Sequence, residues 1–191
     1  MTTPARPTDA LPRELRTERL VIRAWRGDDA PELRPILLAN QEHLKRWIPE
    51  HVYTAPPLPQ LVERLDRFAA KFAAGVEYRY ALRDALTGRI VGGMSLFPRD
   101  AAARVQLTLA DRVELGYWLR SDATGQGLIT EASRALLAVA ATLPHLSHVE
   151  IRCDARNAPS AAIPKRLGFT LAEEPAEMQV WVRSLADFER A

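Results

Sequence analysis

Hydrophobic residues follow two different spacings along the chain, one typical of strands and one typical of helices. Apolar and polar residues alternate over residues 19–25, RLVIRAW, which predicts a strand with one buried face. An apolar stripe that begins at Leu33 predicts a helix capped by Asp28 or Asp29. A second helix is expected over about residues 60–74, because its apolar residues recur at steps of four, three and four.

The rest of the chain mixes strands and helices in an irregular order. The pattern predicts strands over 78–83, 90–97, 113–119, 149–153, 169–172 and 178–183, and helices over about 127–142 and 158–167. A doubly wound sheet would alternate regularly, so this order favours a mixed α+β fold with helices on both faces of the sheet. Residues 1–16 hold three prolines and no apolar period, which predicts a flexible N-terminal tail before a single domain, residues 17–191.

Composition places the chain among ordinary globular proteins. The length of 191 residues suits one domain, and 47% apolar with 26% charged residues excludes a disordered or disulfide-framework chain. A net charge of +2 is too balanced to indicate direct nucleic-acid binding. The one cysteine, Cys153, excludes an internal disulfide and favours a reducing compartment. Without a signal-peptide pattern or a long apolar run, we expect a cytoplasmic protein with no membrane partner.

The most informative segment is ELGYWLRSDATGQGLITEA, residues 114–132. It predicts a strand, a turn, and a Gly-Gln-Gly sequence that opens a helix. A helix start leaves backbone N–H groups unpaired, and glycines allow an anion to approach them. A diphosphate-sized anion site is therefore expected between Gly125 and Thr130, with a plain glycine-rich turn as the alternative. The chain contains neither the P-loop motif nor the dinucleotide-binding GxGxxG motif.

A second group of residues lies in NAPSAAIPKRLGF, residues 157–169. Together with Glu-x-Gly-Tyr-Trp-Leu and Gly-x-Gly-x-x-Thr-Glu-Ala before it, this order of motifs resembles the GNAT acetyltransferase superfamily. The Arg-Leu-x-Ile-Arg strand near the N-terminus and His-Leu-x-x-Trp-Ile-Pro at residues 43–49 are similar to its RimJ/RimL branch. That branch comprises N-terminal amine acetyltransferases of ribosomal proteins. The similarity covers about residues 17–184.

The resemblance implies a central, mostly antiparallel sheet of about six to seven strands, splayed between the strands at 113–119 and 149–153. It implies acetyl-CoA as the co-substrate, with the pantetheine arm in the splayed cleft. The backbone of Trp118 and Leu119 would pair with that arm. Asn157 would hydrogen-bond the arm or help to position the thioester. The diphosphate would bind the backbone amides of Gly125, Gln126, Gly127, Leu128, Ile129 and Thr130.

The resemblance also assigns candidate catalytic residues. Many members of the superfamily have a tyrosine acid five residues before the Phe of Gly-Phe, but this chain has Pro164 there. Ser160 is then the remaining candidate acid, and first-turn capping is its alternative role. Glu114, on the cleft-forming strand, is the candidate general base, and its alternative is an ion pair with one of the many arginines.

The acceptor pocket is less defined. Trp47, Tyr53 and Tyr117 are candidate substrate-binding residues, with ordinary packing as the alternative for each. The four histidines show no metal-binding spacing, and Cys153 is expected to be buried and inert, so no metal site is predicted.

The sequence thus predicts an acetyl-CoA-dependent N-acetyltransferase that works by direct attack in a ternary complex. A protein N-terminal α-amine of the ribosomal type is the expected acceptor. The alternatives are a small-molecule amine, such as an antibiotic, polyamine or peptide toxin, and a CoA-binding module without catalysis. A homodimer is expected only because members of the RimJ/RimL branch commonly form one.

Overall fold

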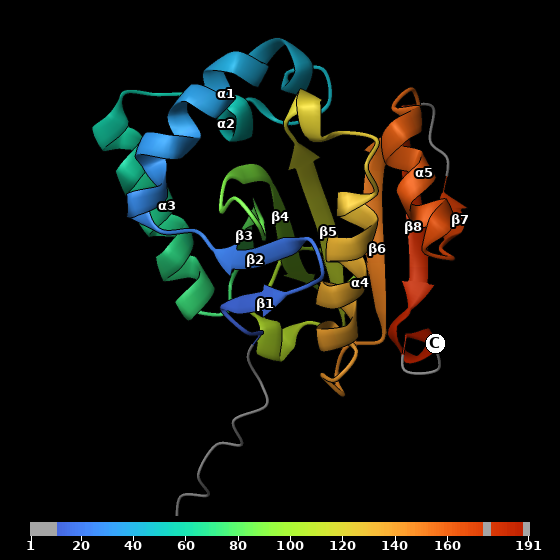
Figure 1. Ribbon diagram of the computed structural model, residues 1–191. Helices are drawn as coiled ribbons and strands as arrows, with labels where there is room; N and C mark the ends of the chain where they lie inside the picture. Colours follow the sequence, from blue (N-terminus) through green and yellow to red (C-terminus); the bar gives the residue numbers. More distant parts are fainter. Residues whose placement is uncertain (1–10, 174–176, 189–191) are drawn as a thin grey trace, which may run out of the picture.

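The computed structural model describes residues 11–173 and 177–188, which form eight strands and five α-helices (Figure 1). The strands are β1 Glu14–Arg16, β2 Leu20–Ala24, β3 Tyr78–Asp84, β4 Ile90–Arg99, β5 Arg112–Leu119, β6 His148–Asp154, β7 Thr170–Glu173 and β8 Met178–Ser184. The helices are α1 Ala30–Leu44, α2 Glu50–Tyr53, α3 Leu58–Ala73, α4 Leu128–Ala140 and α5 Ala158–Arg166. No described helix has the length and apolar character that crossing a membrane requires.

The strands form one sheet in the order β1-β2-β3-β4-β5-β6-β8-β7. Among the described strands, β5 and β6 are the one parallel pair. Their pairing covers Arg112–Leu115 and His148–Ile151 and then stops, although both strands continue. The predicted splay between the strands at 113–119 and 149–153 is therefore confirmed, and the fork opens directly after Leu115.

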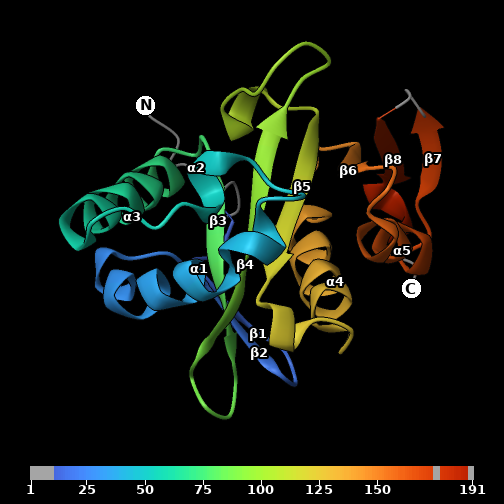
Figure 2. The same cartoon turned by 90° about the horizontal axis from the view of Figure 1, so that it is seen from above.

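Figure 2 shows α1 and α3 on one side of the central strands and α4 on the other. A hydrophobic core lies on each face of the sheet. Side chains alternate along a strand, so Tyr80 and Leu82 of β3 enter the core beneath α4, whereas Ala81 enters the core beneath α1 and α3. The α1 stripe includes Leu33 and Leu37, both of which are buried as the spacing predicts. The expectation of helices on both faces is confirmed.

The N-terminal segment differs from the sequence prediction. The predicted flexible tail covered residues 1–16, but residues 14–16 form β1, which pairs with β2, and Leu11 is buried. This addition brings the sheet to eight strands instead of six to seven. A polar three-residue edge strand leaves no apolar period, which is why the pattern missed it. Residues 1–10 lie outside the described residues.

The proline-rich segment between α1 and α3 contains a short helix. Helix α2 ends at Tyr53 and α3 begins at Leu58, so only residues 54–57 between them are non-helical. Pro49 and Pro57 occupy the N-cap positions of these helices, where a missing N–H removes no helical hydrogen bond.

Asp29 is the N-cap residue of α1, but its side chain does not make the capping hydrogen bond that the sequence predicts. Its carboxylate instead accepts a hydrogen bond from the Arg26 amide at 2.9 Å and ion-pairs with Arg23 at 2.6 Å and Arg83 at 2.9 Å. The side chain is buried, and it ties β2 and β3 to the start of α1.

Candidate active site

The β5–β6 fork opens into a cavity of about 810 Å³. Glu114 and Trp118 line it from the sheet face that carries α1 and α3, because side chains alternate along β5 and Trp118 packs against that helix pair. Tyr117 lines it from the opposite face and packs against the core beneath α4. The cavity therefore passes through the sheet, and residues from both faces line it.

The loop before α4 has the backbone of an anion site. Gly125 and Gly127 have φ values of +75° and +78°, which other residues rarely adopt. The first hydrogen bond of the helix runs from the Glu131 amide to the Gly127 carbonyl at 3.1 Å, so the amides before it have no partner within the helix. The Thr130 Oγ1 is buried, borders the cavity and has no hydrogen-bond partner among the residues that the structure describes. The loop thus offers donors that this part of the chain does not use.

Side chains around the loop hold its conformation. Arg19 donates to the Gln126 carbonyl at 2.9 Å and ion-pairs with Glu131 at 2.6 Å. The Gln126 side chain donates to the Asp122 carbonyl at 3.1 Å and so turns away from the cavity. Leu128 and Ile129 bury their side chains in the core, so the bulk of Ile129 does not close the loop.

The free edge of β5 beyond the fork belongs to Tyr117 and Leu119. The Arg120 amide donates to the Val91 carbonyl of β4 at 2.9 Å, and backbone groups alternate sides along a strand. The backbone of Trp118 therefore faces β4, and its carbonyl lies against Gly92. Of the two residues expected to pair with the pantetheine arm, Leu119 presents its backbone to the fork and Trp118 does not.

Ser160 and Tyr117 meet at the start of α5. The Tyr117 hydroxyl lies 3.2 Å from the Ser160 Oγ and 3.2 Å from the Ser160 carbonyl oxygen. The Asn157 side chain accepts the Ser160 amide at 3.2 Å and caps the helix. Capping, the alternative role of Ser160, thus belongs to Asn157. All three residues line the cavity.

Burial sets the protonation of this side of the cavity. Burial raises the pKa of the Tyr117 phenol, and the hydrogen bond with Ser160 opposes that shift. Burial likewise raises the pKa of the Cys153 thiol. Both groups are therefore neutral near pH 7, and Cys153 is buried as expected.

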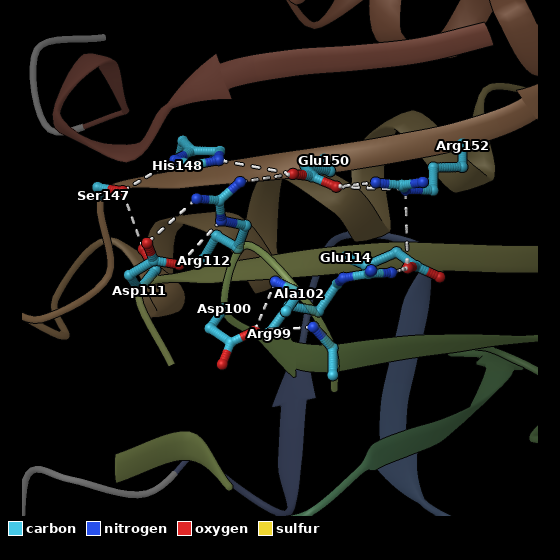
Figure 3. A network of polar contacts seen from close by, with 11 residues as sticks. Arg99, Asp100, Ala102, Asp111, Arg112, Glu114, Ser147, His148, Glu150 and Arg152 are labelled. Atoms are coloured by element: carbon cyan, nitrogen blue, oxygen red, sulfur yellow. Dashed lines mark hydrogen bonds and ion pairs between the residues drawn. The ribbon is translucent and has the colours of Figure 1, made fainter. Parts of the chain in front are cut away.

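Glu114 stands at the fork inside a group of arginines (Figure 3). One carboxylate oxygen accepts a hydrogen bond from Arg99, and the other accepts one from Arg104 at 3.0 Å. Arg152 of β6 lies 4.0 Å away. A carboxylate has about four lone-pair positions, so Glu114 keeps capacity for a further hydrogen bond in the cavity.

Glu150 lies opposite Glu114 on β6 and is buried. It binds Arg152 at 2.9 Å and Arg112 at 3.2 Å, and His148 lies 3.6 Å from it. Burial alone would raise its pKa, but the two arginines hold the pKa below its usual value. Glu150 is thus a fixed anion that positions Arg152 beside the fork.

Two of the three expected substrate-binding residues line the cavity, and the third does not. Trp47 lines the cavity and remains 39% exposed, and Tyr117 lines it from the other face. Tyr53 instead packs against the core beneath α1 and α3 and does not line the cavity. No group of His, Cys, Asp or Glu suited to a metal occurs among the residues that the structure describes.

Sequence reasoning gave Glu114 an arginine partner as its alternative role, but it did not say which arginines belong to the site. Arg99, Arg104 and Arg152 surround Glu114, and Arg134 and Arg166 border a depression beside the glycine loop before α4. Arginine is the common basic residue of this chain, so its positions carry no motif. Only the abundance of arginine could have hinted at them.

The sequence of this chain is similar to those of known acetyltransferases. The model of the acetyltransferase (GNAT) domain matches residues 19–170. A Bacillus subtilis protein, YdaF, provisionally named a ribosomal N-acetyltransferase, is 28% identical over 176 residues, which cover 88% of this chain and 86% of YdaF.

Solved structures share the fold. RimL, the ribosomal L7/L12 α-N-protein acetyltransferase in complex with coenzyme A, superposes with a TM-score of 0.73 at 20% identity, covering 91% of this chain and 97% of RimL. The ribosomal-protein-S5-alanine acetyltransferase from Vibrio fischeri gives a TM-score of 0.76 at 18% identity, covering 92% and 98%.

Proposed function

Because this chain belongs to the GNAT acetyltransferase family, we propose that it transfers an acetyl group from acetyl-CoA to the α-amine of a protein N-terminus. One observation carries the proposal. A continuous cavity runs through the β5–β6 fork, with unused backbone donors of the glycine loop before α4 along it and Glu114 at the fork.

The residues present fit acetyl-CoA, which when bound supplies an acetyl group activated as a thioester. The amides at the start of α4 and the orphaned Thr130 hydroxyl would hold the diphosphate. The free β5 edge at Tyr117 and Leu119 would pair with the pantetheine amides. Asn157 lines the same channel. Its side-chain oxygen caps α5, and its side-chain amide nitrogen can donate a hydrogen bond to the pantetheine arm.

Glu114 would accept the proton of the acceptor amine. An α-amine has a pKa of about 7.7–8.0, so a large fraction is protonated at pH 7 and must lose a proton before it attacks. Glu114 reaches the fork from the face of α1 and α3, and its lone pairs that the arginines leave free can bind the amine or a bridging water.

Ser160 would donate a hydrogen bond to the departing thiolate. Tyr117 is protonated at physiological pH, because burial raises its pKa, and it donates its one hydrogen to the Ser160 carbonyl. The Ser160 hydroxyl, 3.2 Å from the Tyr117 oxygen, can therefore donate to that oxygen at rest and would turn to the thiolate as it departs. Tyr117 is thus a positioning residue for Ser160.

The names of YdaF, RimL and the S5-alanine acetyltransferase support a protein N-terminus as the acceptor. The cytoplasmic location, the homodimer and the absence of direct nucleic-acid binding stay predictions from the sequence.

The test is a thiol-release assay with acetyl-CoA and a panel of acceptors. N-terminal peptides of ribosomal proteins are compared with small amines, and the same peptides with a blocked N-terminus serve as controls. We expect thiol release with free peptides only, and mass spectrometry should place the acetyl group on the α-amine. Tight acetyl-CoA binding without turnover of any amine would contradict the proposal and favour a CoA-binding module.

A further inference from the structure

One end of the cavity is basic, and it is lined by residues from four segments of the chain: His51, Arg64, Arg79 and Arg104. We call these four residues the basic end. Arg79 shares a sheet face with Ala81, which packs beneath α1 and α3. The basic end therefore lies on the same face of the sheet as Glu114.

Arg64 is the cation of the basic end that no carboxylate of the described residues neutralises. Its terminal nitrogens donate to the backbone carbonyls of His51 and Thr54, each at 3.0 Å. Its Nε is buried without a hydrogen-bond partner, and none of the described carboxylates forms an ion pair with it. A buried donor without an acceptor destabilises the fold, so this guanidinium suits an acceptor from outside the chain.

Arg79 and Arg104 keep the local charge positive even though each has a carboxylate partner. Every carboxylate beside them is bound by a second cation, so positive charges outnumber negative ones. The ion pairs are Arg79 and Lys71 on Glu77, and Arg104 and Arg99 on Glu114.

Phe97 fixes the two arginines in place. The Arg104 guanidinium carbon lies 3.7 Å from the centroid of the Phe97 ring, and that of Arg79 lies 5.0 Å from it. Stacking restrains a guanidinium while its N–H edges stay available for a carboxylate or phosphate. The arginines are thus oriented before any ligand arrives.

The pKa of His51 reflects the nearby cations. Burial lowers its pKa, and Arg79, Arg64 and Arg104 lower it further, whereas Glu77 acts in the opposite direction. The imidazole is therefore neutral near pH 7 and does not add to the charge.

We infer that the basic end binds an anionic group of the acceptor, a carboxylate or a phosphate, and that the enzyme favours amines that carry one. For a protein acceptor this means an acidic side chain close to the N-terminus. The inference rests on the proposed function, because it takes Glu114 as the point where the amine binds. Arginine is the side chain best suited to such a group, since its planar fork matches both anions.

The experiment compares matched peptides that differ only in charge. Peptides with Glu, Gln or Lys at positions two to four are assayed for kcat/KM at saturating acetyl-CoA. Small amines with a phosphate or a carboxylate form a second arm, which distinguishes a peptide from a small-molecule source of the anion. We expect Glu peptides to exceed Gln peptides by about 10-fold, as a charge-assisted hydrogen bond predicts, and Lys peptides to be poorest.

Arg64→Gln should reduce this preference for Glu over Gln peptides to about twofold or less and leave the KM for acetyl-CoA unchanged. The matched control is Arg67→Gln, one turn along α3, whose side chain is 65% exposed. It should retain the full preference. Arg64→Lys keeps the charge and should restore part of the preference, which separates charge recognition from loss of the contacts to His51 and Thr54.

Equal kcat/KM for Glu and Gln peptides, or a preference unchanged in a folded Arg64→Gln variant, would overturn the inference. Calorimetry with the same peptides and unacylated CoA tests the basic end separately from the proposed function, because it measures peptide binding without acetyl transfer. Tighter binding of Glu peptides that depends on Arg64 supports the basic end even when no peptide is acetylated. Acetylation of all peptides with no Arg64-dependent difference in binding supports the proposed function and rejects the basic end.

Discussion

The Tyr117 hydroxyl donates to the Ser160 carbonyl, the backbone oxygen that Pro164 leaves without a helical partner. A residue at position 164 with an N–H would bond this carbonyl, since helical hydrogen bonds span four residues. Proline has no N–H, and α5 nevertheless continues to Arg166. Tyr117 thus replaces the missing donor across the fork and brings its hydroxyl to the Ser160 Oγ.

Tyr117→Phe should lower kcat by about 10-fold and the free energy of unfolding by about 1–2 kcal/mol, because Ser160 loses a hydrogen bond at both oxygens. The double variant Tyr117→Phe with Pro164→Ala separates the two effects. Alanine restores the backbone donor, so the double variant should regain stability but not kcat. Recovery of kcat in the double variant would show that Tyr117 serves the helix alone.

Ser160→Ala should lower kcat by about 10-fold and leave the dissociation constant of acetyl-CoA nearly unchanged, since a thiolate with a pKa of about 8.5 needs little help to depart. Its melting temperature should change little, because Asn157 is the cap. Asn157→Ala is the comparison and should destabilise the fold by about 1 kcal/mol. Full kcat in Ser160→Ala would leave water as the donor to the thiolate.

Glu114→Gln should lower kcat at pH 7 by about 10²–10⁴-fold if the carboxylate takes a proton from the amine. The deficit should shrink at high pH, where the amine is already neutral. The test measures kcat from pH 6 to pH 10 and the dissociation constant of acetyl-CoA. The dissociation constant should equal that of the wild type. A variant with lower stability but wild-type kcat at pH 7 would make Glu114 an ion-pair partner of the arginines and nothing more.

Gly127→Val should weaken acetyl-CoA binding strongly, because a branched side chain would stand between the phosphate and the helix amides. Its positive φ also predicts a loss of about 1–2 kcal/mol in stability. Gly88→Val is the matched control, since Gly88 has a φ of +70° in open space on the β3–β4 turn. Calorimetry should show weaker binding for Gly127→Val alone, and equal binding by both variants would place the diphosphate elsewhere.

Asp29 should make the fold sensitive to acid. Burial alone would raise its pKa, but Arg23, the Arg26 amide and Arg83 together hold the pKa below its usual value. Its contribution is therefore complete above the unfolded pKa of about 3.9 and is lost as the pH falls through the lower folded value.

Asp29→Asn should lower stability at pH 7 by about 3 kcal/mol, because it leaves two partly buried arginines short of a partner. Denaturant unfolding at several pH values should show this difference from wild type narrowing below about pH 4. A difference that stays constant down to pH 2 would mean that the Asp29 charge contributes nothing.

The sequence by itself determined the features that depend on neighbouring residues. Alternation and helical spacing located nearly every long element, and the glycine loop before α4 was predicted from Gly125 and Gly127, whose φ values only glycine adopts readily. Glu114 and Ser160 were also named from their motifs, and both line the cavity. These features are local, because the backbone preferences that produce them lie within a few residues of chain.

Tertiary structure alone decided which distant side chains meet. Strand pairing brings Arg99 to Glu114, and the fork brings Tyr117 to Ser160, 43 residues away in sequence. The Arg64 guanidinium likewise reaches the carbonyls of His51 and Thr54 because α3 lies beside the end of α2. No spacing along the sequence reveals this contact. Such contacts depend on how separate segments register and pack, and a single sequence records the residues without recording their pairings.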